Sequence, residues 1–174
     1  KGMDMAEIGV GDVAPAFELP QAGGGTLSLA SLKGKPVVLY FYPKDDTSGC
    51  TAEAIAFSGL KPQFAKAGAV VVGMSPDSVR SHDKFKSKHG LAVELVSDED
   101  KKVLETYGVC AEKSMYGRKY MGVERTTFLI GPDGRTAHVG RMRRTNHRAR
   151  GRVAPRAASG HAGHAGGGDR ARGQ

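Results

Sequence analysis

The sequence predicts an α/β fold in which helices flank a central mixed β-sheet. Two apolar runs, PVVLYFY at 36–42 and AVVVGM at 69–74, have the length and the β-branched content of buried strands. Segments of helical composition separate these runs from each other and from later strands, and the turn GPDG at 131–134 joins the last two strands. Strands and helices that alternate and then end in a hairpin form one layered domain.

The first helix follows the strand at 36–42. We expect it to begin near Cys50, because the segment TAEAIAFSGL at 51–60 contains good helix formers. Gly59 and Pro62 are expected to break or kink this helix, since proline removes a backbone donor and clashes with the preceding turn.

The second helix, SPDSVRSHDKFKSKHG at 75–90, has the clearest start and end signals. Ser75 is expected to cap it, Pro76 to occupy the first helical position, and Asp77 to complement the helix dipole. Gly90 is expected to end it.

The rest of the domain continues the alternation. A short strand is expected at 93–96, a helix with an acidic N-terminus at 98–108, and a hairpin whose strands are 126–130 and 135–139. A thioredoxin-like fold is one solution for this order of elements, and the pattern alone leaves a flavodoxin-like sheet open.

Length and composition bound the classes of function. At 174 residues the chain suits one domain with a full core, and no stretch approaches the roughly 18 apolar residues of a membrane helix. The N-terminus lacks the apolar region of a signal peptide, so we expect a cytoplasmic protein without a membrane partner. Cys50 and Cys110 are the only cysteines and form no CxxC pair. This favours a reducing compartment, and we expect no metal and no cofactor.

The net charge of +8 comes entirely from the C-terminal segment. Residues 1–140 carry 17 basic and 17 acidic side chains, whereas residues 141–174 carry nine arginines against Asp169. We therefore expect a flexible N-terminus at 1–8, a domain at 9–140 and a disordered basic tail rich in Arg, Gly and Ala at 141–174. A reading-frame change in GC-rich coding sequence would explain that tail.

A polyanion-binding arm is the alternative explanation of the tail. The segment has no aromatic residue to stack on bases, so nucleic acid is not the partner we expect. His161 and His164 lie in a tract of Gly and Ala and do not by themselves predict a metal site.

The candidate chemistry centres on Cys50, in the segment PKDDTSGCTAE at 43–53. A cysteine at the start of a helix lies among unpaired backbone N–H groups at the positive end of the dipole, which favours the nucleophilic thiolate. The hydroxyl of Thr47 could hydrogen-bond the sulfur or a bound oxygen, and Pro43 could turn the loop over the thiol. A cysteine that is simply packed in the core is the alternative, because free cysteines are often buried.

Three separated motifs resemble the peroxiredoxins, whose signature is PxxxTxxC. The segment YFYPKDDTSGCTAEA looks like their bacterioferritin comigratory protein or peroxiredoxin Q branch. GDVAPAFELP at 11–20 resembles the entry segment of that branch, and YGVCAEKSMYGRKYMGVERTTFLIGPDGR at 107–135 resembles the stretch leading to its active-site arginine, which falls on Arg125. The resemblance covers about residues 9–140 and implies a thioredoxin-like fold.

The resemblance also implies a thiol-dependent peroxidase that reduces hydrogen peroxide and organic hydroperoxides. Cys50 would attack the terminal peroxide oxygen and become a sulfenic acid. Arg125 would hold the peroxide and favour the thiolate, Thr47 and backbone N–H groups would stabilise charge on the reacting oxygens, and Glu53 would orient Arg125. The family reductant is thioredoxin, and glutaredoxin or a small thiol are the other candidate partners.

Departures from the family pattern affect the second half of the cycle. Ser48 stands where the branch usually has proline, which should loosen the loop. Ile55 stands where many members carry a resolving cysteine, so the disulfide that those members form within the helix is impossible. Cys110 is then the only internal candidate for resolution, and we expect instead a one-cysteine cycle in a monomer or weak dimer. The alternative function is a thioredoxin-fold binding or chaperone-like protein with lost or impaired peroxidase activity; a dithiol oxidoreductase would require CxxC.

Overall fold

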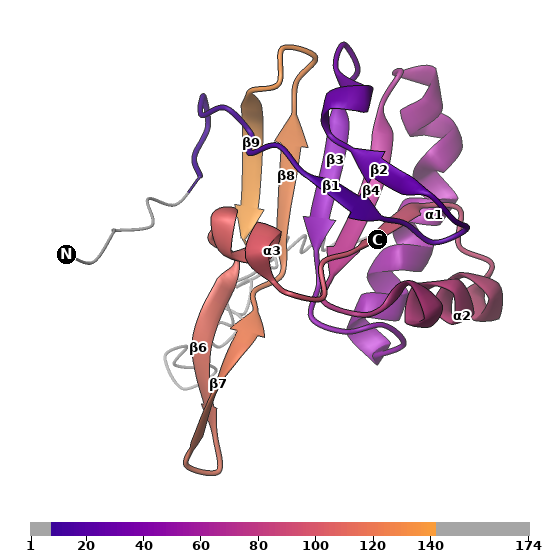
Figure 1. Ribbon diagram of the computed structural model, residues 1–174. Helices are drawn as coiled ribbons and strands as arrows, with labels where there is room; N and C mark the ends of the chain where they lie inside the picture. Colours follow the sequence, from indigo (N-terminus) through magenta and orange to yellow (C-terminus); the bar gives the residue numbers. More distant parts are fainter. Residues whose placement is uncertain (1–7, 142–174) are drawn as a thin grey trace, which may run out of the picture. The chain divides into compact units, whose positions relative to one another are not determined.

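Residues 8–141 are described by the structure, a computed structural model, except for the side chains at 111–113, 115, 120 and 121. A five-stranded sheet lies at the centre of this part of the chain (Figure 1). Its strands in spatial order are β5 (Glu94–Ser97), β4 (Val70–Ser75), β3 (Val37–Phe41), β8 (Thr126–Ile130) and β9 (Thr136–Arg141). The predicted flexible N-terminus at 1–8 and the predicted tail at 141–174 lie outside the described residues, apart from Ile8 and Arg141.

The sheet is mixed, as the sequence predicts. β3 runs parallel to β4, with Tyr40 opposite Gly73, and β4 runs parallel to β5. On its other side β3 runs antiparallel to β8, which forms an antiparallel hairpin with β9. The two antiparallel strands exclude the parallel flavodoxin-like sheet, and the fold is thioredoxin-like. Each predicted strand lies within one or two residues of the strand observed.

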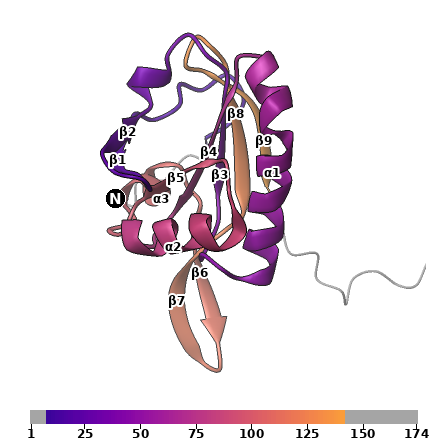
Figure 2. The same ribbon diagram turned by 90° about the vertical axis from the view of Figure 1, so that its right-hand side faces the viewer.

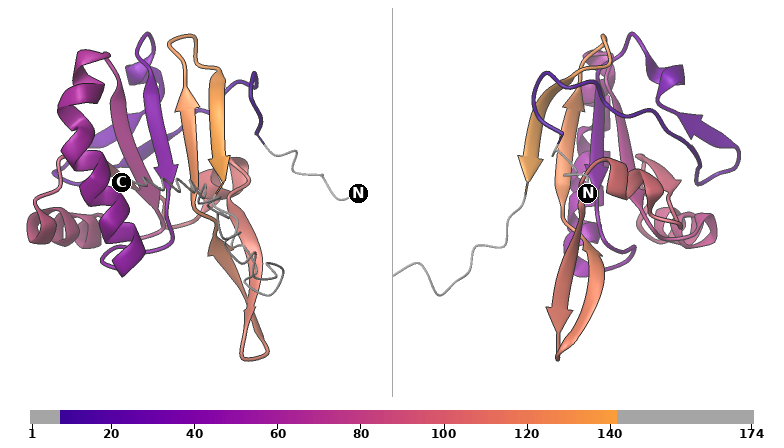
Figure 3. Two further views of the ribbon diagram at one scale, coloured as in Figure 1. Left: turned by 180° about the vertical axis from the view of Figure 1, so that it is seen from behind. Right: turned by 60° about the vertical axis from the view of Figure 1, so that its left-hand side comes forward.

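Alternate residues of β3 face two apolar clusters on opposite sides of the sheet. The α1 cluster joins β3 to α1 (Ser48–Lys66) and α2 (Val79–His89), and it contains Val38, Tyr40, Tyr42, Cys50, Ala54 and Phe85. The α3 cluster joins β3 to α3 (Lys102–Thr106) and the segment before β1 (Glu18–Pro20), and it contains Ala14, Phe17, Leu39, Phe41, Leu104 and Tyr107. Figure 2 shows α1 and α3 on either side of the sheet, and Figure 3 shows the α1 face from behind.

The first helix is longer than predicted. α1 begins close to Cys50 and continues through Gly59 and Pro62 to Lys66, so of the expected break or kink the break is wrong. Phe57 and Phe64 both pack on the α1 cluster, one on each side of Pro62, while Pro62 itself is exposed. Packing of the apolar face therefore outweighs the loss of one backbone donor on the solvent side.

The start of the second helix also differs from the prediction. The cap is Ser78, whose side chain accepts a hydrogen bond from Ser81 N at 3.1 Å. Ser75 instead ends β4, is fully buried, and donates to the Asp77 carboxylate at 2.7 Å, so it is not available as a cap. The predicted end is confirmed, because Gly90 adopts the left-handed conformation with φ of 60°.

The predicted helix at 98–108 is only the short α3. Asp98 and Asp100 remain in the preceding turn, where their carboxylates accept from the backbone N–H groups of Leu104 at 2.8 Å and Lys102 at 3.1 Å. The acidic residues thus cap the helix from outside rather than extend it.

Two hairpins and one short helix were not predicted from the sequence. β1 (Glu18–Pro20) pairs with β2 (Thr26–Ser28), which precedes a 3-10 helix at Ala30–Leu32, and β6 (Cys110–Met115) pairs with β7 (Arg118–Val123). Tyr116 and Gly117 form the β6–β7 turn with φ of 52° and 76°, the geometry of a two-residue hairpin. Across residues 8–141, no helix is long and apolar enough to cross a membrane.

Candidate active site

Cys50 lies in the first turn of α1, directly after the loop that leaves β3. Thr47 is the N-cap residue, with φ of −88° and ψ of 152°, and its carbonyl accepts from Thr51 N at 2.8 Å. Cys50 is the third helical residue, so its N–H belongs to the group that has no partner within the helix. The side chain is only 1% exposed. The sulfur therefore lies beneath the surface at the positive end of the helix dipole.

Arg125 lies in the short connection between β7 and β8 and reaches across to Cys50. Its Nη2 donates to Sγ of Cys50 at 3.1 Å, although the two residues are 75 positions apart in the sequence. A guanidinium donor stabilises a thiolate more than a thiol, because the hydrogen bond then carries charge on both partners. Cys50 and Arg125, both predicted from the sequence, are thus brought together.

Gly49 makes room for that contact, and sequence reasoning missed it. A Cβ atom at position 49 would lie 2.5 Å from Nη2 of Arg125 and 3.0 Å from its Cζ. The guanidinium therefore passes over the first turn of α1 where only glycine leaves space. The one signal in the sequence is a glycine in the first turn of a helix, where it costs stability relative to alanine.

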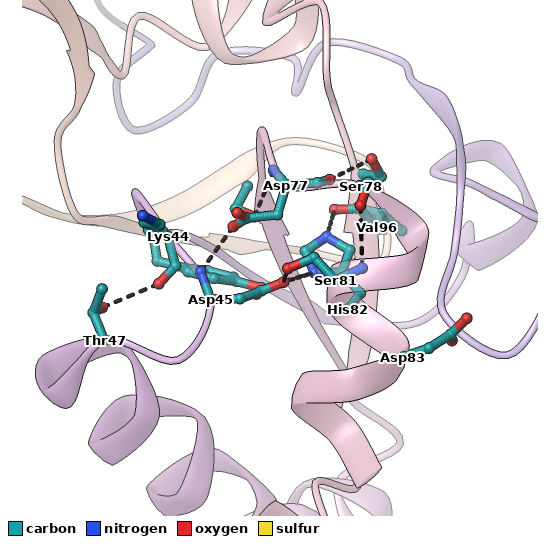
Figure 4. A network of polar contacts seen from close by, with 12 residues as sticks. Lys44, Asp45, Thr47, Asp77, Ser78, Ser81, His82, Asp83 and Val96 are labelled. Carbon is teal, nitrogen blue, oxygen red and sulfur yellow. Dashed lines mark hydrogen bonds and ion pairs between the residues drawn. The ribbon is translucent and has the colours of Figure 1, made fainter. Parts of the chain in front are cut away.

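Thr47 and Pro43 lie in the loop between β3 and α1. The hydroxyl of Thr47 donates to the carbonyl of Lys44 at 3.0 Å (Figure 4). Its proton is engaged within the loop, and its lone pairs can accept from a bound peroxide. Pro43 is half-buried at the start of the loop.

Glu53 lies one turn after Cys50, with its Oε1 buried and without a hydrogen-bond partner in the described part of the chain. Burial raises the pKa of the Glu53 carboxyl, and the charge of Arg125 opposes that shift only partly. Glu53 and Arg125 therefore interact through charge, but no direct ion pair between these two described residues is present.

A buried polar network holds the loop before Cys50, and sequence reasoning missed it as well. Asp45 is 7% exposed, and its carboxylate accepts from the hydroxyls of Tyr42 and Ser81 at 2.6 and 2.8 Å. Nδ1 of His82 lies 2.7 Å from the same carboxylate (Figure 4). The backbone N–H of Asp45 donates to Asp77 at 2.8 Å. The residues are spread over the loop after β3, the β4–α2 connection and α2, so no local pattern in the sequence joins them.

Cys110 lies apart from this site. It begins β6 and packs against the α3 cluster, whereas Cys50 belongs to the α1 cluster on the opposite face of β3. Burial raises the pKa of the Cys110 thiol, with Glu105 adding to the shift and Lys101 opposing it. Both cysteines are free thiols.

A thioredoxin-like sheet that presents a buried cysteine in the first turn of a helix, with an arginine donating to the sulfur, is the architecture of a cysteine-based peroxidase. Comparison with known proteins agrees. The sequence matches the AhpC/TSA family over residues 10–139. A relative from Coxiella burnetii is 55% identical over 127 residues, which make up 73% of this chain and 84% of the relative. Peroxiredoxin Bcp of Bacillus subtilis is 48% identical over 128 residues, or 74% of this chain and 82% of that protein.

Solved structures give the same result. The bacterioferritin comigratory protein of Xanthomonas campestris, studied for alkyl peroxide reduction, has a TM-score of 0.69 and 45% identity, and the match covers 72% of this chain and 80% of that one. Xylella fastidiosa PrxQ has a TM-score of 0.74 and 39% identity, with 78% and 87% covered. The chain belongs to the AhpC/TSA family of peroxiredoxins, in the Bcp or peroxiredoxin Q branch. It is a peroxidase that reduces hydroperoxides at the expense of a thiol reductant.

Proposed function

We propose that Cys50 is the peroxidatic cysteine and that Arg125 activates it. The contact between Nη2 of Arg125 and Sγ of Cys50, at the N-terminus of α1, is the observation that carries the assignment. The thiolate attacks the terminal oxygen of the hydroperoxide and the O–O bond breaks. Sulfur is oxidised to sulfenic acid, and the leaving alkoxide or hydroxide takes up a proton to depart as an alcohol or as water.

The neighbouring residues support the same step in different ways. The guanidinium of Arg125 has further N–H groups that can donate to the peroxide oxygens, and the free backbone N–H groups of the first turn of α1 add to them. The hydroxyl oxygen of Thr47 accepts a hydrogen bond from the peroxide O–H, because the hydroxyl proton of Thr47 is already donated to the backbone carbonyl of Lys44. Glu53 acts on Arg125 through charge, and Pro43 shapes the loop.

The sulfenic acid is reduced by an external thiol, in a one-cysteine cycle. The first thiol forms a mixed disulfide with Cys50 and releases water, and a second thiol then frees Cys50 and leaves with the first as a disulfide. Two features favour this route over an internal disulfide. Ile55 occupies the position of the helical resolving cysteine, and Cys110 packs on the other side of the sheet. Thioredoxin, glutaredoxin and small thiols are the candidate reductants.

The catalytic domain is proposed to be residues 9–140, in agreement with the family match over 10–139. A monomer or weak dimer is proposed as the working unit. The cytoplasmic location stays a prediction from the sequence, as do the flexible residues 1–8 and the disordered tail at 141–174.

Mass spectrometry after one equivalent of hydrogen peroxide tests the assignment. We expect a gain of one oxygen on Cys50, trapped by a sulfenic acid reagent, and no disulfide. The Cys50→Ser variant is the control and should consume no peroxide while keeping its fold. Full turnover by that variant would contradict the role of Cys50, and a wild-type protein that consumes no peroxide would favour the binding or chaperone-like alternative.

A further inference from the structure

The loop that carries the peroxidase motif is fixed to the body of the protein mainly at Asp45. The backbone N–H and both carboxylate oxygens of Asp45 form hydrogen bonds to residues of the segment just after β3, the β4–α2 connection and α2; these are Tyr42, Asp77, Ser81 and His82. The hydrogen bond of Thr47 to Lys44, by contrast, lies within the loop. Asp45 is buried, so its contacts are shielded from water and salt.

His82 connects this anchor to the sheet. Its ring is fully buried, with Nε2 2.9 Å from the carbonyl oxygen of Val96 in β5 and Nδ1 2.7 Å from Asp45 Oδ2. A carbonyl oxygen can only accept a hydrogen bond, so Nε2 carries a hydrogen and donates a hydrogen bond to the Val96 carbonyl oxygen. The other ring nitrogen is thereby directed at the Asp45 carboxylate. His82 thus links the loop of the active site to β5, an edge strand of the central sheet (Figure 4).

A second contact between the loop and α2 is of a different kind. Asp46 accepts from Lys88 at 2.7 Å and from His89 at 2.9 Å, but Asp46 and Lys88 are exposed. Exposed ion pairs contribute little to stability. Among the described residues, the buried contact of Asp45 with His82 is therefore the stronger tie.

The cycle requires this loop to open. The Cys50 side chain is 1% exposed, and an external thiol must bring its own sulfur to bonding distance of the Cys50 sulfur. Cys50 lies in the first turn of α1 and is buried in the α1 cluster, so this turn and the loop that leads into it have to move before the sulfenic acid can be reduced. Peroxide reduction requires the opposite, because Arg125 contacts Cys50 only when the turn is formed.

We propose that Asp45 and His82 are positioning residues that set the free energy of this opening. The inference rests on the proposed reduction by an external thiol. The pair holds the closed conformation that reduces peroxide and limits how often the sulfenic acid is exposed to the reductant. Its loss therefore affects the two half-reactions differently.

Population arithmetic gives the size of the effect. While the closed conformation stays dominant, a roughly tenfold rise in the open population leaves the closed population almost unchanged. The rate of peroxide reduction then falls by less than about threefold, whereas the rate of sulfenic acid reduction rises about tenfold. Removal of a residue that merely stabilises the fold would change neither rate in the molecules that stay folded.

The rate measurements use the full chain with Cys110→Ser, so that only external thiol can reduce the sulfenic acid, and the unmodified chain is kept for a separate search for a Cys50–Cys110 disulfide. His82→Gln keeps an amide donor for Val96 and loses the contact with Asp45. Ser81→Ala removes one donor from the same carboxylate with less disturbance of the core, and it keeps the test valid if the His82 variant fails to fold. Lys88→Gln is the matched control, because it removes only the exposed contact from the same helix.

Two rates are measured for each folded variant, by quenched flow and mass spectrometry. The first is oxidation of Cys50 by hydrogen peroxide, and the second is formation of the mixed disulfide when the sulfenic acid meets glutathione. We expect the second rate to rise in His82→Gln and, by a smaller factor, in Ser81→Ala, with Lys88→Gln unchanged. An unchanged or lower second rate in the folded variants would overturn the proposal. A Cys50–Cys110 disulfide in the unmodified chain would instead overturn the one-cysteine cycle, and the two failures are thus distinguishable.

Discussion

Gly49 and Arg125 share one small volume above the first turn of α1. A Cβ atom on Gly49 would lie 2.5 Å from Nη2 of Arg125, and this is the nitrogen that donates to the sulfur of Cys50. The far end of a flexible side chain can move aside, so an added methyl group would displace the guanidinium rather than unfold the helix. The position is therefore constrained by the chemistry and not by the stability of α1.

Gly49→Ala should separate activity from stability. Alanine in a helix is worth about 0.5–1 kcal/mol over glycine, so the free energy of unfolding should rise slightly or stay constant. Peroxide reduction should fall by about ten- to a hundredfold, because a displacement of about 1 Å in a catalytic group has effects of that size. Stopped-flow assays of peroxide consumption measure the rate, and urea unfolding measures the free energy of unfolding.

Gly59→Ala is the control for that substitution. Gly59 is in the same helix and exposed, and apart from its chain neighbours and the nearby helix backbone nothing lies within 4 Å of its added Cβ. It should gain the same helical stability with an unchanged rate. Equal rates for the two alanine variants would show that the Arg125 contact does not depend on Gly49.

Arg125→Ala should slow peroxide reduction by about 10²–10³, which corresponds to about 2–4 kcal/mol of transition-state stabilisation for one preorganised donor. The second-order rate constant with hydrogen peroxide is the measurement. Arg118→Ala is a suitable control, because Arg118 is exposed at the start of β7. A rate within twofold of wild type for Arg125→Ala would remove this arginine from the site.

Local patterns predicted the parts of the structure that depend on neighbouring residues. The apolar runs gave the strands β3 and β4, and Gly90 gave the end of α2, because burial and backbone conformation at these places are set within a few residues. The continuation of α1 through Pro62 was not predicted, because it depends on contacts that Phe57 and Phe64 make with the sheet. Propensity is a weak guide where tertiary packing decides.

In the candidate site, too, local features could be predicted from the sequence and contacts between distant residues could not. The start of a helix at Cys50 was visible in the sequence, whereas the contact with Arg125 spans 75 positions and was expected only through the family resemblance. The bond between Asp45 and His82 spans 37 positions and was not expected at all. Such pairs are created by the topology of the sheet, which brings the β3 loop against α2.

Glu53→Gln should change how stability depends on pH. Burial raises the pKa of Glu53 above its usual value of 4.5, so the folded protein binds this proton more tightly than the unfolded chain. The stability that this proton contributes is fully present below pH 4.5 and is lost as the pH rises through the raised folded value. Relative to Glu53→Gln, the wild type should therefore lose stability as the pH rises from acidic to neutral.

Urea unfolding at a series of pH values measures that difference, and pairing each variant with wild type cancels the other titrating groups. Glu99→Gln supplies the baseline, because Glu99 is an exposed acidic side chain. The difference in free energy of unfolding between wild type and Glu53→Gln is followed against pH. If it does not change with pH, or if it favours the wild type more strongly at neutral pH, the burial of the Glu53 charge is contradicted.

Cys110→Ser should leave turnover near the wild-type value with a small thiol such as glutathione. Resolution by Cys110 would require its thiolate to attack the sulfenic sulfur of Cys50. Burial raises the pKa of the Cys110 thiol, so little of it is ionised at neutral pH. Its packing on the α3 cluster, across the sheet from Cys50, also prevents a direct approach.

A disulfide needs Cα atoms within about 7 Å, so a bond between Cys50 and Cys110 would require both clusters to be disrupted. Peptide mapping under non-reducing conditions, after one equivalent of peroxide and without added thiol, gives the measurement. We expect Cys50 as sulfenic acid or its further oxidation products and Cys110 as free thiol. Cys110→Ser should show the same Cys50 species in the same proportions, because Cys110 takes no part. A Cys50–Cys110 peptide formed within one turnover, and lost turnover in Cys110→Ser, would mean that opening of the active site extends through the sheet to β6.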